Sequence, residues 1–258
     1  MVNKKIKAAL AAAVLSAFFA SGAAVAADAP IELTADAIEY DATTDTAVAT
    51  GGVKVLRDGG VMTGAEATYD FKSKQVVVTG GVTANKDDMS LKADKLTATV
   101  NSEITATGNV VITKGENVLT GPEVHYNQAS SDISMPYGGS ADGPQAAIRG
   151  DVLSGNLMTN QYQAQGDVYL NSKMNDVQST SDTATYTGSG QDFNFTADGN
   201  VNLRSDSRNM TGHSDHAVYN SAENGKLVMT GNASATQNGN IVRGNTLTVY
   251  MGDNVKVE

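Results

Sequence analysis

The sequence predicts an all-β fold of many short strands, arranged as a sandwich, a roll or a solenoid. Two observations favour it. Glycine-centred segments recur about every 30 residues, and apolar residues alternate with polar ones on both sides of each glycine. No stretch after residue 26 has the spacing of an amphipathic helix.

The repeat is marked by glycines that precede another Gly, an Asn or an Asp. Successive marks lie between 28 and 33 residues apart. The unit at Gly138 departs from the pattern, because Ser140 and Asp142 occupy its later apolar positions. The marking glycines are Gly51, Gly80, Gly108, Gly138, Gly166, Gly199 and Gly231.

The alternation predicts one apolar face for each run, because successive side chains of a strand point to opposite faces. Each glycine shares the parity of the apolar residues, and a glycine inside a strand usually marks a bend or a bulge. We therefore expect a corner at each glycine, where the sheet curves around its own interior. The residues predicted to face that interior are Val53, Val55, Val76, Val78, Val110, Ile112, Val168, Leu170, Phe195, Val201, Leu203, Leu227 and Met229.

A second strand follows each glycine strand and usually ends on a tyrosine. These tyrosines could form a platform that stacks carbohydrate rings, but half-buried rings whose hydroxyls point outward are the favoured reading. Residues 136–144, PYGGSADGP, are predicted to be the longest loop. The tyrosines are Tyr40, Tyr69, Tyr126, Tyr186, Tyr219 and Tyr250.

Residues 1–26 read as a cleavable signal peptide. Lysines precede an apolar stretch from Ala8 to Ala20, and Ala24-Val25-Ala26 forms an A-x-A cleavage site. We expect a mature protein of residues 27–258 that folds as one domain in the periplasm of a bacterium. The chain has no cysteine, which excludes disulfides, thiolate metal sites and a lipidated lipobox.

The charge argues against nucleic acid as a partner. Without residues 1–26 the chain has 15 Lys and Arg against 28 Asp and Glu, a net charge of −13. A protein that binds nucleic acid needs a basic stripe to neutralise phosphates.

The sequence shows no set of residues typical of an active site, so we predict no catalytic activity, no cofactor and no metal site. The chain has no nucleophile motif, zinc motif or phosphate loop. His213 and His216 lie three apart, which on a regular strand puts them on opposite faces. His125 stands beside Tyr126 and is expected to pack on the surface.

Three segments together resemble the OstA-like (LptA) family of periplasmic lipopolysaccharide-transport proteins. They are IELTADAIEYDATTDTAVATGGVKVLRDGG from Ile31, LKADKLTATV from Leu91, and LVMTGNASATQNGNIVRGNTLTVYMGDNVKVE from Leu227. Each segment alone is generic for β-structure, whereas their order is more specific. The resemblance covers the mature chain and is weakest over residues 130–160.

The resemblance implies a fold and a function. The fold would be a twisted antiparallel β-jelly roll, open at both ends, with an apolar groove for the acyl chains of lipid A. The function would be to move lipopolysaccharide from the inner to the outer membrane, in contact with the inner-membrane transport complex and the outer-membrane translocon. Ile31 and Leu33 would line one end of the groove, and the predicted inward residues would line the rest.

The resemblance also implies head-to-tail oligomers, because an open roll has unpaired strands at both ends. The residues expected on these edge strands are Ile31, Leu33, Ile241, Leu247 and Val249. An alternative remains open from the residues themselves: a periplasmic or surface β-repeat scaffold, or an adhesin, whose interior is tightly packed and holds no lipid.

Overall fold

The computed structural model describes residues 32–57, 59–99, 103–127, 129–144, 146–173, 176–189 and 192–252. All regular structure in these ranges is β-strand, which confirms the all-β class. Contacts divide the chain into two compact units, unit 1 (Met1–Ile133) and unit 2 (Ser134–Glu258). The single domain over residues 27–258 stays a prediction. The predicted signal peptide and Ile31 lie outside the described residues.

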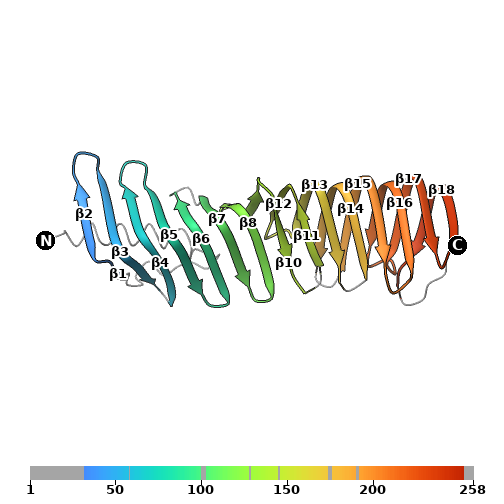
Figure 1. Ribbon diagram of the computed structural model, residues 1–258, viewed down its shortest axis with the longest axis horizontal. Coiled ribbons are helices and arrows are strands. Elements are labelled where there is room, and N and C mark those ends of the chain that lie inside the picture. Colours follow the sequence, from blue (N-terminus) through green and yellow to red (C-terminus); the bar gives the residue numbers. More distant parts are fainter. Residues whose placement is uncertain are drawn as a thin grey trace. The chain divides into compact units, whose positions relative to one another are not determined.

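Unit 1 is an antiparallel meander in which each strand from the third to the eighth pairs with the next (Figure 1). The first two strands are short and both pair with β3. The strands are β1 (Glu32–Thr34), β2 (Ala37–Asp41), β3 (Thr46–Arg57), β4 (Gly60–Asp70), β5 (Gln75–Lys86), β6 (Met89–Ala98), β7 (Glu103–Lys114) and β8 (Asn117–Asn127). β9 (Asp132–Met135) crosses the boundary between the units.

Unit 2 has the same antiparallel pattern, but it begins with short strands. β11 and β12 pair with the two halves of β13, so together they take the place of one long strand. From β13 onward each strand pairs antiparallel with the next. The strands are β10 (Gly139–Asp142), β11 (Ala146–Gly150), β12 (Val152–Asn156), β13 (Gln161–Ser172), β14 (Val177–Ser189), β15 (Asp192–Ser205), β16 (Met210–Asn220), β17 (Lys226–Gln237) and β18 (Asn240–Tyr250).

The prediction of a long loop over residues 136–144 is wrong for the second half of this range. Gly139–Asp142 forms β10 and pairs with β11, with Gly139 opposite Gly150 and Asp142 opposite Ala147. The ladder partner supplied by β11 overrides the low strand propensity of this glycine-rich stretch.

Six of the seven predicted corners exist, and each of the six is a β-bulge. The seventh glycine, Gly138, lies between β9 and β10 and not inside a strand, so the predicted corner there is wrong. In β3, Gly51 and Gly52 lie between the pairs Thr50↔Glu66 and Val53↔Gly64, so two residues face the single residue Ala65. Both glycines have positive φ, 77° and 57°. Glycine and asparagine adopt this conformation at least cost, which explains why Gly-Gly and Gly-Asn recur at this position.

A side chain from the preceding strand covers the first glycine of most corners. A Cβ on Gly108 would lie 2.2 Å from Oδ2 of Asp94, so glycine is needed for space as well as for φ. Asn109, the second corner residue, donates from Nδ2 to the same oxygen at 3.1 Å. The same amide–carboxylate bond joins Asn200 to Asp182 and Asn232 to Asp215, at 2.9 Å each.

The corners fold each unit's sheet over onto itself. We call the strand halves that carry the strand-end tyrosines the tyrosine arm, and the halves beyond the corner the opposite arm. A Cβ on Gly64 of the opposite arm would lie 2.5 Å from Cγ1 of Val78 of the tyrosine arm. In unit 2, a Cβ on Gly212 would lie 2.9 Å from Sδ of Met229. The two arms therefore face each other across one apolar interior.

The hairpin turns at the tips of the tyrosine arm are capped in the same way. In unit 1, Oδ1 of Asp70 accepts hydrogen bonds from the backbone N–H groups of Lys72 and Ser73, at 2.7 and 3.0 Å. These bonds, that from Ser73 first, hold the pKa of Asp70 below its ordinary value. Lys74 then takes a positive φ of 54°. The cap explains the Asp or Asn that follows several of the tyrosines.

We predict that Gly108→Ala destabilises the protein more than Gly115→Ala does. Both glycines have positive φ, which costs an alanine about 1–3 kcal/mol, but only Gly108 also faces Asp94. At Gly115 the nearest atom to an added Cβ is 3.8 Å away. Urea denaturation measures both free energies of unfolding. Equal losses would show that Asp94 does not occupy the corner.

Candidate functional site: the apolar interior between the arms

The structure places twelve of the fifteen predicted groove residues in the buried interior. Val55 is 0% exposed, whereas its neighbour Lys54 faces solvent. That these buried side chains contact a lipid stays a prediction. The twelve are Val53, Val55, Val76, Val78, Val110, Val168, Leu170, Phe195, Val201, Leu203, Leu227 and Met229.

The other three predicted groove residues differ. Leu33 on β1 and Ile112 on β7 are half-buried. Both lie near a strand end, where fewer neighbours cover the side chain. Ile31 lies outside the described residues.

The inward residues of the strands that face the bulges were not predicted from the even spacing around the glycines. On β4, Met62 and Gly64 point inward before the corner, but beyond it Ala67 does, so the even spacing is broken at Ala65. The single corner residue causes this shift of parity. The missed residues include Met62, Leu91, Leu96 and Val124. The Ala or Asp at which the alternation breaks, such as Ala65, was the signal in the sequence that could have identified these residues.

Aromatic rings form a continuous row in the tyrosine arm of unit 2. Ring centroids are 6.1 Å apart for Tyr162–Tyr186, 5.8 Å for Tyr186–Phe193, and 5.3 Å for both Phe193–Tyr219 and Phe195–Tyr219. Burial raises the pKa of Tyr219 above its ordinary value. Because Tyr219 is buried, this row is part of the interior and not a surface platform.

Tyr40 in unit 1 has the outward-pointing hydroxyl predicted for the strand-end tyrosines, but the residue is 41% exposed rather than half-buried. Its ring packs edge-on against Phe71, with centroids 5.7 Å apart. Its hydroxyl donates to Oδ1 of Asp45 at 2.8 Å, pointing outward from the tip.

The tips of the two arms of unit 2 are joined by Arg208. This residue lies in the turn between β15 and β16, at the tip of the opposite arm, and Nη2 donates to the carbonyl oxygen of Met251 just after β18. Nη1 also donates to Oγ of Ser205 at 3.3 Å. Met251 is buried. The interior of unit 2 is therefore closed at this point of its rim.

β18, the last strand of unit 2, is covered on one half only. Leu247 is half-buried and Val249 is buried. Ile241 is 54% exposed. Val242 pairs with the half-buried Ala235, yet it is 49% exposed. The opposite arm of unit 2 thus leaves part of its apolar inner face uncovered at β18.

The prediction that His213 and His216 point to opposite faces is wrong. Gly212 and Ser214 face inward, and so does Ala217, because the corner residue Asp215 shifts the parity. Both histidines therefore lie on the outer face. Within the described residues no group of three or more His, Asp or Glu side chains could hold a metal ion.

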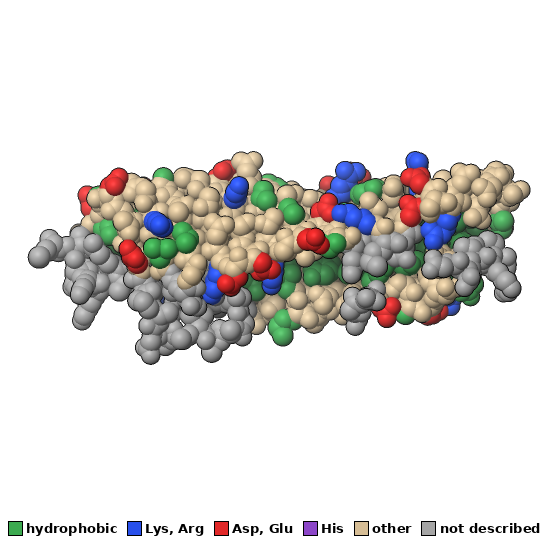
Figure 2. Space-filling view, turned by 90° about the horizontal axis from the view of Figure 1, so that it is seen from below, with side chains coloured by type: hydrophobic (Ala, Val, Ile, Leu, Met, Phe, Trp, Pro, Cys, Tyr) green, Lys and Arg blue, Asp and Glu red, His purple; other side chains and the backbone are tan. Residues whose placement is uncertain are grey.

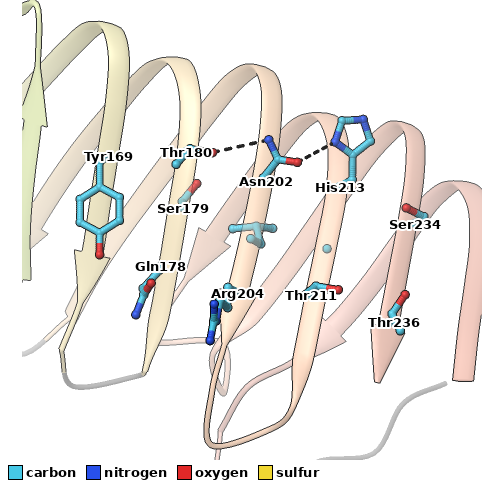
Figure 3. A pocket seen from close by; sticks show the side chains of 12 residues that line it. Tyr169, Gln178, Ser179, Thr180, Asn202, Arg204, Thr211, His213, Ser234 and Thr236 are labelled. Atoms are coloured by element: carbon cyan, nitrogen blue, oxygen red, sulfur yellow. Dashed lines mark hydrogen bonds between the residues drawn. The ribbon is translucent and has the colours of Figure 1, made fainter. Parts of the chain in front are cut away.

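A polar depression of about 410 Å³ lies on the outer face of β13 to β17 (Figure 3). His213 Nδ1 lies 3.1 Å from Oδ1 of Asn202, whose Nδ2 is 3.5 Å from Oγ1 of Thr180. Ser179 and Leu203 are buried at its floor. His213, Asn202 and Thr180 bond to one another across it, so the depression is a polar surface rather than an apolar pocket.

The outer surface is mixed in charge. On the face shown in Figure 2, acidic and basic side chains are scattered over a polar surface, and hydrophobic side chains gather in a band along unit 2. None of the described segments forms a helix of the length and apolarity that a membrane span requires.

A family described as "LptA/(LptD N-terminal domain) LPS transport protein" matches residues 61–103 and 98–255, which is most of the chain. The protein belongs to this family. Membership in the LptA/LptD N-terminal family assigns the chain a general role in lipopolysaccharide transport. It also agrees with the resemblance found in the sequence, and with the jelly roll that the resemblance implied.

Among solved structures, the chain is similar to LptH of Pseudomonas aeruginosa, described as the LptA-homologous periplasmic component of the conserved lipopolysaccharide transport device. The identity is 19% and the TM-score 0.35, and the match covers 38% of this chain and 76% of LptH. No curated protein sequence matches the chain.

We predict that Val55→Asp destabilises unit 1 by about 3 kcal/mol or more, because the carboxylate would be buried without a partner. The matched variant Lys54→Asp places the same charge on the solvent side of the strand and should change stability by less than about 0.5 kcal/mol. Thermal unfolding followed by circular dichroism measures both. Equal effects would show that the two faces of β3 are wrongly assigned.

Proposed function

We propose that this protein carries lipopolysaccharide through the periplasm, from the inner to the outer membrane, with the acyl chains held between its two arms. One observation carries the proposal: the inner faces of both arms are predominantly apolar along the described strands, while the outer faces are mostly polar. Burial of apolar chains is favourable by about 25 cal/mol per Å². The family match supports the cargo class.

The arms must separate to admit the chains. Val78 packs against Gly64, and Met229 against Gly212, so the arms touch in this structure. These contacts are van der Waals contacts, which an entering acyl chain can replace in kind. The sugars and phosphates of the cargo would stay at the opening between the tips. Because the mature chain has a net charge of −13, we infer that divalent cations lie between it and the phosphates.

The packing also favours the rival function, a β-repeat scaffold with a permanently closed interior. Val55 and Met229 are fully buried, which is the state of an ordinary core. Whether lipid enters the interior decides between the two functions.

Replacement of methionine by photo-methionine, a diazirine analogue of similar shape, tests for entry without overpacking the core. Met62 and Met229 face the interiors of units 1 and 2, whereas Met158 is exposed at a hairpin turn. After irradiation with lipopolysaccharide, mass spectrometry should find acyl-chain adducts on Met62 and Met229 and none on Met158. Adducts on Met158 alone, or no adducts, would favour the scaffold.

We propose further that copies associate head to tail through β18, in a chain that reaches the inner-membrane complex and the outer-membrane translocon. The turn Asn238-Gly239 has positive φ at both residues, as in a two-residue type I′ hairpin. Gln237 and Asn240 then form a hydrogen-bonded pair, so Ile241 and Arg243 direct their N–H groups to the free edge. Such an edge can pair with a strand of another copy.

Proline at Ile241 should abolish association and leave the fold intact, because this position has no ladder bond to lose. Proline at the next residue, Val242, removes a donor that faces β17 and should lower the thermal unfolding temperature. Sedimentation velocity over a hundredfold dilution series measures the association. A wild-type protein that stays one species at every concentration would contradict the bridge.

A further inference from the structure

The interior of unit 2 contains buried hydroxyl groups that the interior of unit 1 lacks. Five serines are buried in the described part of the chain, and all five belong to unit 2. In unit 1 every buried side chain that the structure describes is apolar. The five are Ser172, Ser179, Ser181, Ser205 and Ser214.

Two of these serines have no hydrogen-bond partner among the described groups. Ser181 donates from Oγ to the carbonyl oxygen of Thr183 at 2.9 Å, and Ser205 donates to Oδ2 of Asp176 at 3.1 Å. Oγ of Ser179 and Oγ of Ser214 have none. Ser179 is 3% exposed and Ser214 is 0% exposed, so solvent does not reach these hydroxyls. Buried hydroxyls of native proteins are normally bonded, so each exception needs an explanation.

Both unpartnered serines lie on the inner wall of the opposite arm, among aliphatic side chains. Ser179 on β14 is in register with Leu170 on β13 and Leu203 on β15. Ser214 on β16 is in register with Val201. One strand, β15, lies between β14 and β16, so the two strands are two spacings apart, about 10 Å. The wall is therefore apolar with two separate polar points set into it.

The repeat itself does not require these hydroxyls. Ser214 directly precedes the corner residue Asp215, and in unit 1 Ala93 holds the same place before Asp94. Ser179 lies three residues before Asp182, and its counterpart before Asp94 is Leu91. Because the same fold accepts alanine and leucine there, a hydroxyl without a partner is a cost that the fold alone does not explain.

We propose that Ser179 and Ser214 hydrogen-bond to polar groups borne along the acyl chains of the cargo, such as a chain hydroxyl or an ester carbonyl. A serine hydroxyl can donate to the carbonyl oxygen, and it can donate to or accept from a hydroxyl. Unit 2 is then selective for substituted chains, whereas the wholly apolar wall of unit 1 accepts plain ones. This inference rests on the proposed function, because it requires acyl chains in the interior.

The test compares two probes that differ by one hydroxyl, N-tetradecanoyl glucosamine and N-(3-hydroxytetradecanoyl) glucosamine. The wild-type protein should bind the hydroxylated probe about tenfold more tightly, since a site that hydrogen-bonds a hydroxyl discriminates against the analogue without it. The double variant Ser179→Ala/Ser214→Ala should lose this preference and keep its affinity for the plain probe. Isothermal titration calorimetry measures both affinities.

Ser181→Ala is the matched control, because it removes a buried hydroxyl of the same wall that already has a partner. It should keep the tenfold preference. Thermal unfolding of the double variant tests whether the two serines have a merely structural role. Because the substitutions remove two hydroxyls that have no partner, the double variant should be at least as stable as the wild type.

Each other outcome overturns the inference. Binding of both probes with equal affinity by the wild type contradicts the role of the serines and leaves the proposed function standing. A preference that persists in the double variant, or that Ser181→Ala abolishes as well, has the same consequence. Binding of neither probe contradicts the proposed function together with this inference.

Discussion

The corner bulge is the constraint on which the rest of the structure depends. Two residues of positive φ, such as Gly108 and Asn109, face one residue of the next strand, and the same kind of bulge recurs along both units. Without it the long strands would form a flat sheet with one apolar face in water. With it the arms fold over each other, and the long strands contribute both of their halves to the interior of their unit, except at the exposed first half of β18. The carboxylate of Asp94 over Gly108 fixes the bend locally.

A sheet closed in this way gives an interior held by weak, replaceable contacts. In the described part of the chain the backbone runs from one arm to the other at the corner, and across the interior the arms meet through side chains such as Val78 and Met229. A carrier of acyl chains needs this property, because chains must enter and leave without breaking a hydrogen-bonded ladder. The ladder itself supplies the rigidity, since every strand pair from β3 to β8 and from β13 to β18 is antiparallel and long.

The two units use the same frame with different interiors. The fully buried side chains described in unit 1 are all aliphatic, whereas unit 2 buries a row of aromatic rings around Tyr219 and the hydroxyls of Ser179 and Ser214. Unit 2 also carries the rim contact of Arg208 and the half-covered strand β18. These differences show that the two units are not simple repeats of one another.

The sequence by itself determined the repeat, the strands, the corners and the inward faces of the bulged strands, because strand alternation and the φ preference of glycine act locally. Val53 and Leu203 could be placed from spacing alone. The tertiary structure decided what depends on partners distant in the chain. The register opposite each bulge sets which way Met62 and His216 point, and β11 makes Gly139–Asp142 a strand. Folding of one arm onto the other brings Met229 against Gly212 and leaves Ser214 without a partner, because such contacts follow from the bend and not from any local pattern.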